Sequence, residues 1–162
     1  MKAVVVYESL WGNTEAVARA IAEGLGGGAA ALNTDEATGE AVAGADLIVG
    51  GAPLLGFQLP TDEMRKGIVD NKANKRGDFS HPTMRAWLDG LPAGSGRGAG
   101  FETRIWWSPG SAAKTIGELL AAKGFAPAAE PHKFIVTGRY GPLKDGELDR
   151  ARAWGHELAA GD

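Results

Sequence analysis

The sequence predicts an α/β fold: a doubly wound, five-stranded parallel sheet with helices on both faces. Short apolar runs alternate five times with amphipathic segments along the 162 residues. The first run, Ala3–Tyr7, has no polar alternation, which is typical of a strand buried on both faces of a parallel sheet. No repeat, linker or change of composition divides the chain. We therefore expect residues 1–162 to form a single domain.

The first half of the chain is expected to supply three strands and two helices. In order, these are the strand Ala3–Tyr7, the helix Thr14–Leu25, the weak strand Ala29–Asn33, a short helix around Glu40–Ala43 and the strand Asp46–Gly51. The first helix is indicated by apolar residues such as Val17 and Ile21 on one face, with Asn13 or Thr14 as its cap. Residues 52–80 show no clear period and are expected to be irregular.

The second half is expected to alternate in the same way. Its elements are the helix His81–Gly90, the strand Ala99–Ile105, the helix Ser111–Lys123, the strand His132–Gly138 and the helix Asp145–Ala160. Pro82 suits the first turn of a helix, and Ser111 is a suitable cap. The last helix is expected to turn Leu148 and Leu158 inward.

Composition excludes several classes of function. The net charge is -3, so no broad basic surface predicts a nucleic-acid partner. The chain has no cysteine, which excludes disulfides, thiolate metal sites and cysteine nucleophiles. His81, His132 and His156 lack the spacing of a metal site, and we expect them at the surface or at strand ends. The first apolar run is too short for a signal peptide or a membrane span, and we expect no membrane association. A cytoplasmic protein is expected, which is consistent with the absence of cysteine.

The stretch SLWGNT, residues 9–14, lies between the first strand and the first helix. A helix N-terminus offers unpaired N–H groups and a partial positive charge to an anion. Ser9, Asn13 and Thr14 can add side-chain donors, and Gly12 lets the backbone close around an oxygen. No lysine follows the glycine, unlike the P-loop of nucleotide triphosphatases. The alternative interpretation is a tight turn with a polar helix cap.

The run VVYESLWGNT, residues 5–14, resembles the flavodoxin signature. In that family this loop holds the phosphate of FMN through hydroxyl and backbone N–H groups. The fivefold alternation and the length are also similar, so the resemblance covers nearly the whole chain. It implies a flavodoxin-like fold with strand order 2-1-3-4-5 and bound FMN.

The resemblance also implies which residues bind the cofactor, in the loops after the first, third and fourth strands. They are Ser9, Leu10, Trp11, Gly12, Asn13, Thr14, Ala52, Pro53, Leu54, Leu55, Gly56, Phe57, Thr103, Arg104, Trp106 and Trp107. Phe57, Trp106 and Trp107 are candidates to stack on the flavin ring, although either tryptophan can instead belong to the core. In the family, a peptide containing a glycine such as Gly56 accepts a hydrogen bond from reduced flavin N5. No catalytic side chain and no metal ligand is implied.

The expected function is electron transfer through bound FMN. One alternative is a flavin-dependent reductase of quinones or other small acceptors, and another is a flavodoxin-like binding module that has lost FMN. The expected partner is a redox protein or a small electron acceptor, and the protein is expected to be a monomer or a homodimer. The basic run KANKR, residues 72–76, is interpreted as a solvated loop, with a lid that docks a partner as the alternative.

Overall fold

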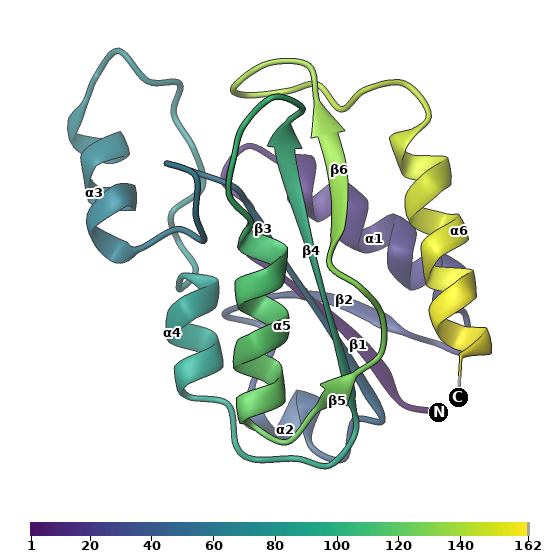
Figure 1. The fold of residues 1–162 in the computed structure, drawn as a ribbon. Coiled ribbons are helices and arrows are strands. Elements are labelled where there is room, and N and C mark those ends of the chain that lie inside the picture. The colour runs from purple at the N-terminus through teal and green to yellow at the C-terminus, as the bar shows by residue number, and fades with distance from the viewer. Residues whose placement is uncertain (162) are drawn as a thin grey trace.

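The computed structural model describes residues 1–161, in which one parallel sheet lies between two layers of helices (Figure 1). The strands are β1 (Ala3–Tyr7), β2 (Ala30–Asn33), β3 (Leu47–Pro53), β4 (Arg97–Ile105), β5 (Ala126–Pro127) and β6 (His132–Val136). The helices are α1 (Asn13–Leu25), α2 (Gly39–Val42), α3 (Asp62–Asp70), α4 (Met84–Asp89), α5 (Ala112–Ala122) and α6 (Glu147–Ala160). The strand order is β2-β1-β3-β4-β5, and β6 also pairs with β4. The expected order 2-1-3-4-5 is therefore confirmed.

The sixth strand arises because the fifth position of the sheet is divided. β5 pairs with the start of β4, at Arg97 and Gly98, whereas β6 pairs with its second half from Phe101 onward. Pro127 and Pro131 flank the interruption and have no N–H to donate to a ladder. The sequence therefore predicted the longer of the two strands and missed the shorter one.

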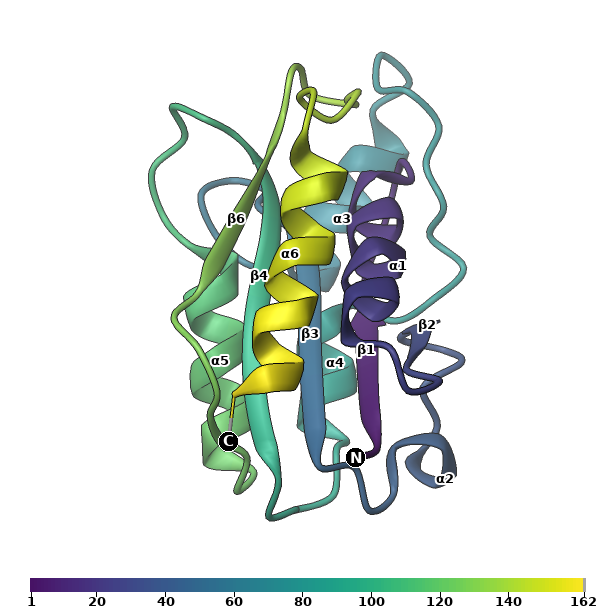
Figure 2. The same cartoon turned by 90° about the vertical axis from the view of Figure 1, so that its right-hand side faces the viewer.

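The two faces of the sheet carry separate cores because successive side chains of a strand point to opposite sides. Val5 packs under α1 and α6, whereas Val4 and Val6 pack toward α4 and α5. Figure 2 shows α1 and α6 side by side on the near face, with α4 and α5 behind the sheet. Every residue of β1 and β3 is buried, as expected for the central strands.

Three local expectations about helices are corrected. Residues 52–80 are not all irregular, because Thr61 caps α3 by accepting the Met64 N–H. The helix expected from His81 begins at Met84, with Thr83 as its cap. Leu148 is an exposed residue of α6, and Trp154 is buried in its place.

Helices α1 and α6 approach each other closely at two glycines. A Cβ atom on Gly24 would lie 2.0 Å from Arg152 O, and one on Gly155 would lie 2.2 Å from Ile21 O. Such distances leave no room for a methyl group, and the obstructing atoms are backbone. The backbones of the two helices are therefore in direct contact, and side chains are excluded from the crossing.

Gly155→Ala is expected to lower the free energy of unfolding by about 1–3 kcal/mol, because the added methyl group forces α6 away from α1. The matched control is Gly117→Ala in α5, where an added Cβ has no atom within 4 Å. That change should raise stability by about 0.5–1 kcal/mol, since alanine favours helix more than glycine does. Urea unfolding of the two variants measures both effects, and equal responses would contradict the close helix contact.

Within residues 1–161, no helix is both long enough and apolar enough to cross a membrane.

Candidate functional site

The loops that follow β1, β3, β4 and β6 lie at one end of the sheet, where these parallel strands finish (Figure 1). Ligands of open α/β sheets bind at this end. Two contacts join the loops directly. Thr14 Oγ1 lies 2.8 Å from Thr103 Oγ1 in β4, and the Asn13 side-chain amide donates to Tyr140 O at 3.0 Å. The structure thus brings the 9–14 loop together with β4 and the loop after β6.

The 9–14 loop presents an array of backbone N–H groups. Ser9 Oγ accepts the N–H groups of Gly12 and Glu15, each at 3.2 Å. Gly12, with φ +92°, is the N-cap of α1, so the expected cap at Asn13 or Thr14 is wrong. Among the residues that the structure describes, no acceptor faces the backbone N–H groups of Leu10, Trp11, Asn13 and Thr14. Unpaired N–H groups at a helix N-terminus are suited to an anion.

The segment before α4 lies across this loop. Asp78 N donates to Leu10 O at 2.8 Å, and the Trp11 indole donates to Lys75 O at 3.2 Å. Lys75 N in turn donates to the Tyr140 hydroxyl, and Trp11 packs edge-on against the Tyr140 ring at 4.9 Å. The basic run 72–76 is therefore anchored over the loop, while its cationic side chains are exposed.

A cavity of about 430 Å³ opens between the loops after β3 and β4 and helix α3. Its lining includes four of the expected residues: Leu54, Leu55, Gly56 and Phe57. It does not include the other twelve, which are the six residues of the 9–14 loop together with Ala52, Pro53, Thr103, Arg104, Trp106 and Trp107. The remaining lining residues were missed in the sequence: Met64, Gly67, Ile68, Asn71, Asn74, Ile105, Ser108 and Arg139. Most of these belong to α3 and the residues after it, in the segment expected to be irregular.

The loop after β3 is a tight turn at the mouth of this cavity. Leu55 and Gln58 exchange two backbone hydrogen bonds of 3.0 Å. Between them, Gly56 and Phe57 have φ +53° and +66°, as in the type I′ turn of a hairpin. Gly56 adopts this conformation without strain, whereas Phe57 is the one residue other than glycine with a positive φ within residues 1–161.

Three large aromatic side chains at this end of the molecule are exposed. Trp106 is 76% exposed, Trp107 60% and Phe57 57%. Neither tryptophan belongs to the core, so the alternative that either packs there is wrong, whereas stacking on a flavin ring stays a prediction. All three are available to a planar ligand or a partner.

A buried ion pair holds the loop after β4. Arg104 Nη1 donates to Glu102 Oε2 and to Gly110 O, both at 2.9 Å, and both charged side chains are almost fully buried. Glu102 Oε1 also accepts the Ser111 hydroxyl and the Ala113 N–H, each at 3.0 Å. The predicted ligand residue Arg104 is thus committed to shaping the loop that carries the tryptophans.

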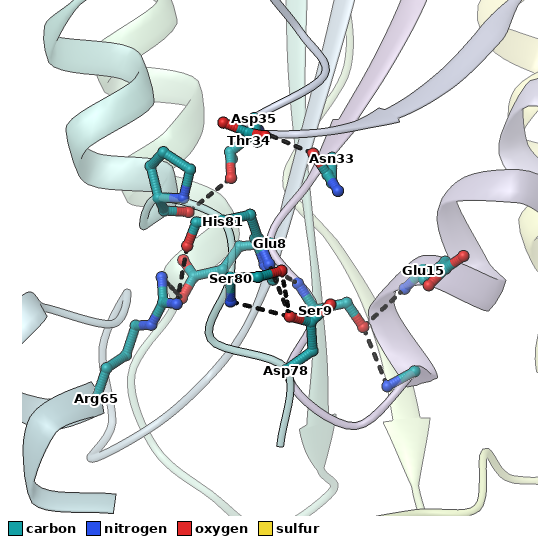
Figure 3. Close-up of polar contacts among 12 residues, drawn as sticks. Glu8, Ser9, Glu15, Asn33, Thr34, Asp35, Arg65, Asp78, Ser80 and His81 are labelled. Atoms are coloured by element: carbon teal, nitrogen blue, oxygen red, sulfur yellow. Dashed lines mark hydrogen bonds and ion pairs between the residues drawn. The ribbon is translucent and has the colours of Figure 1, made fainter. Parts of the chain in front are cut away.

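A second buried polar cluster lies beneath the 9–14 loop (Figure 3). Glu8 Oε1 accepts the Met84 N–H at 2.8 Å. Glu8 Oε2 has no hydrogen-bond partner among residues 1–161 and lies 3.8 Å from Arg65 Nη1. Burial raises the pKa of the Glu8 carboxyl to about 7, and the Met84 N–H and Arg65 offset this only in part. The cluster therefore holds a carboxyl group that titrates near neutral pH.

His81 completes this cluster and is buried, so its expected place at the surface or a strand end is wrong. Its Nε2 atom accepts the Ser9 N–H at 3.1 Å. Burial, followed by the nearby Arg65 charge, lowers the pKa of His81. Among residues 1–161, no three potential metal-ligating side chains lie together.

No family model and no curated protein matches the chain. Solved structures do match over nearly its whole length. A flavodoxin from the domain Archaea has a TM-score of 0.69 and 22% identity, covering 99% of this chain and 97% of that one. Flavodoxin 1 from Bacillus cereus has a TM-score of 0.68 and 20% identity, covering 99% and 98%. A WrbA-like flavodoxin from Agrobacterium tumefaciens has a TM-score of 0.59 and 19% identity, covering 98% and 95%. With the strand order β2-β1-β3-β4-β5 and helices on both faces, the chain has the flavodoxin-like fold.

Proposed function

We propose that the chain binds FMN at the carboxyl end of its sheet and transfers electrons through the bound flavin. The array of unpaired N–H groups in the 9–14 loop carries this proposal, because it offers a monophosphate site at the end of the sheet where a cavity of about 430 Å³ also opens. The flavodoxin-like fold supports it, since the similar structures include flavodoxins. FMN would supply the electron-accepting ring, and the chain would hold, orient and shield it.

The phosphate would be held mainly by backbone groups. Within residues 1–161, the N–H groups of Leu10, Trp11, Asn13 and Thr14 are unpaired. Gly12, at the centre of the loop, has no side chain that could obstruct a phosphate. The positive end of the α1 dipole favours the same charge. Of the side-chain donors expected from the sequence, the Thr14 hydroxyl is shared with Thr103, and the Asn13 amide is occupied by Tyr140. Their main role would be to brace the loop.

The ring would lie toward the cavity lined by the loops after β3 and β4. Leu54, Leu55 and Ile105 provide apolar surface there, and Arg139 is the only charged residue of the lining. Phe57, Trp106 and Trp107 are exposed nearby and would cover the ring or meet the electron acceptor. The acceptor would be a redox protein or a small molecule.

Titration of the purified protein with FMN and, separately, with riboflavin tests the proposal. We expect quenching of the tryptophan fluorescence and a perturbed flavin spectrum, with FMN bound more tightly than riboflavin because only FMN has a phosphate. A protein that perturbs neither flavin would be a binding module without FMN, and the proposal would be wrong. Equal affinities for the two flavins would contradict the proposal that the 9–14 loop binds the phosphate.

Thr14→Val is expected to weaken FMN binding about tenfold and to change riboflavin binding much less. Valine keeps the shape of threonine but removes the hydroxyl that braces the loop against Thr103 and can donate to a phosphate. The matched control is Thr115→Val in α5, whose hydroxyl donates to Ser111 O away from the loop. Isothermal titration of the three proteins measures the effect. Unchanged FMN affinity in the Thr14 variant would argue against this place for the phosphate.

A further inference from the structure

His81 is tied to the candidate phosphate loop across 72 positions of the sequence (Figure 3). Glu8 N, at the end of β1, still bonds to Gly51 O of β3, so Ser9 is the first residue beyond the ladder. Its N–H would be buried without an acceptor if His81 Nε2 did not lie 3.1 Å away. A buried N–H without a partner is costly, so this bond specifies the position of Ser9.

Ser9 in turn organises the loop. Its hydroxyl oxygen accepts the N–H groups of Gly12 and Glu15 and so bridges the two sides of the turn. Along the chain, the unpaired N–H groups of Leu10 and Trp11 precede Gly12, and those of Asn13 and Thr14 come between Gly12 and Glu15. A shift of Ser9 would therefore move the whole array of donors.

The frame that holds His81 comes from three separate elements. Arg65 in α3 donates to His81 O at 2.8 Å, and Thr34 after β2 donates to Pro82 O at 2.6 Å. Glu8 accepts the Met84 N–H at 2.8 Å. The backbone on both sides of the imidazole is thus fixed, which gives the side chain a defined direction toward Ser9.

This arrangement requires a neutral imidazole. Nε2 can accept the Ser9 N–H only if the ring hydrogen is on Nδ1, which has no hydrogen-bond partner within residues 1–161. The charged groups around the ring are Arg65, Glu8, Asp78 and Asp35, and the closest carboxylate oxygen, from Asp78, is 3.8 Å from Nδ1. Protonation would place an N–H of the ring against the N–H of Ser9.

We propose that His81 is a positioning residue for the phosphate loop, and that its protonation releases Ser9 and weakens phosphate binding. The proposal rests on the proposed function, because it assumes that FMN phosphate binds at residues 9–14. It adds a pH response that no residue of the loop itself supplies. It also assigns α3 and the segment that follows it an indirect role in cofactor binding, because Arg65 of α3 holds the backbone of His81.

The test compares the dissociation constants of FMN for the wild type, His81→Gln and His81→Ala between pH 5 and pH 8. Glutamine retains an acceptor that cannot be protonated in this range, whereas alanine has none. At pH 8 we expect the glutamine variant to bind about as tightly as the wild type and the alanine variant about tenfold more weakly. Below pH 6.5 the wild type should lose affinity relative to the glutamine variant. FMN phosphate and Glu8 titrate in both proteins, so this ratio isolates His81.

A second measurement needs no flavin. Two-bond ¹H–¹⁵N spectra of the ligand-free protein should show an unprotonated Nε2 at neutral pH. The Ser9 amide resonance should move over the same pH range as His81 and should stop doing so in His81→Gln.

Three results would overturn the proposal. They are a hydrogen on His81 Nε2 at neutral pH, a Ser9 amide resonance that does not move as His81 titrates, or the same pH profile of FMN binding in the wild type and His81→Gln. If none of the proteins bound FMN at pH 8, the proposed function would fail, and the coupling to phosphate binding with it. The spectra would then still decide whether His81 holds Ser9, so the two failures are distinguishable.

Discussion

Glu102→Gln is expected to lower the free energy of unfolding by about 3 kcal/mol. Glutamine has nearly the same shape as glutamate, so the change creates no cavity. It removes the negative charge that compensates the buried Arg104 guanidinium at 2.9 Å. Breaking a buried pair in this way is costly because one charge remains in a medium of low polarity without its partner.

The matched control is Glu23→Gln, which removes one partner of the exposed ion pair between Glu23 and Arg152. Exposed pairs contribute little, and we expect stability to stay nearly unchanged. Urea unfolding at pH 7 measures both variants. Similar losses in the two would contradict the structural role assigned to the buried pair.

The same substitution should disturb the loops of the candidate site. Arg104 also donates to Gly110 O, and an added Cβ on Gly110 would lie 2.0 Å from Phe57 O, so the loops after β3 and β4 are packed backbone to backbone. A displaced Arg104 would loosen both loops together. A change in tryptophan fluorescence of folded Glu102→Gln would report this movement, because Trp106 and Trp107 lie between Arg104 and Gly110.

The stability of the wild type relative to Glu8→Gln is expected to fall by about 3 kcal/mol as the pH rises from about 4.5 to about 7. The pKa of Glu8 is raised to about 7 in the folded protein, chiefly by burial, from its ordinary value of 4.5. Each unit of difference corresponds to about 1.4 kcal/mol. Between these pH values the unfolded chain releases a proton that the folded protein retains. The contribution of Glu8 is therefore fully present below pH 4.5 and is lost as the pH rises through about 7.

Glutamine at this position does not titrate and remains able to accept the Met84 N–H. Urea unfolding of both proteins at intervals between pH 4 and pH 8 gives the difference directly, and the titration of His81 is common to the two. A difference that stays constant over this range would show that folding leaves the pKa of Glu8 unchanged, and it would contradict the prediction.

Much of the fold could be predicted because the central strands β1 and β3 are buried on both faces and because strands alternate with amphipathic helices along most of the chain. Segment α3 was missed because Gly67 and several charged residues interrupt its apolar period. A local signal was present, since Thr61 precedes two acidic residues and Met64 and Ile68 are four positions apart. The shorter strand β5 has only two residues and ends in a proline, so no periodic pattern can reveal it.

The candidate site could be predicted where it depends on local sequence. The 9–14 loop lies directly between a strand and a helix, so its N–H groups follow from its position. The partner of Ser9 does not, because His81 comes from a distant segment and is directed by Arg65 and Thr34 rather than by its neighbours. Likewise, burial of the Glu102–Arg104 pair depends on how β4 packs against the start of α5.

The glycine crossing of α1 and α6 has a mechanical consequence for this end of the molecule. Helices whose backbones touch at Gly24 and Gly155 cannot come closer together at the crossing. The spacing of α1 and α6 therefore has a lower limit that is set by backbone atoms, and side-chain rotamers cannot change it. The loop that opens α1 and the loop that leads into α6 extend from helices held at this spacing, and Trp11 and Tyr140 of these loops are in contact.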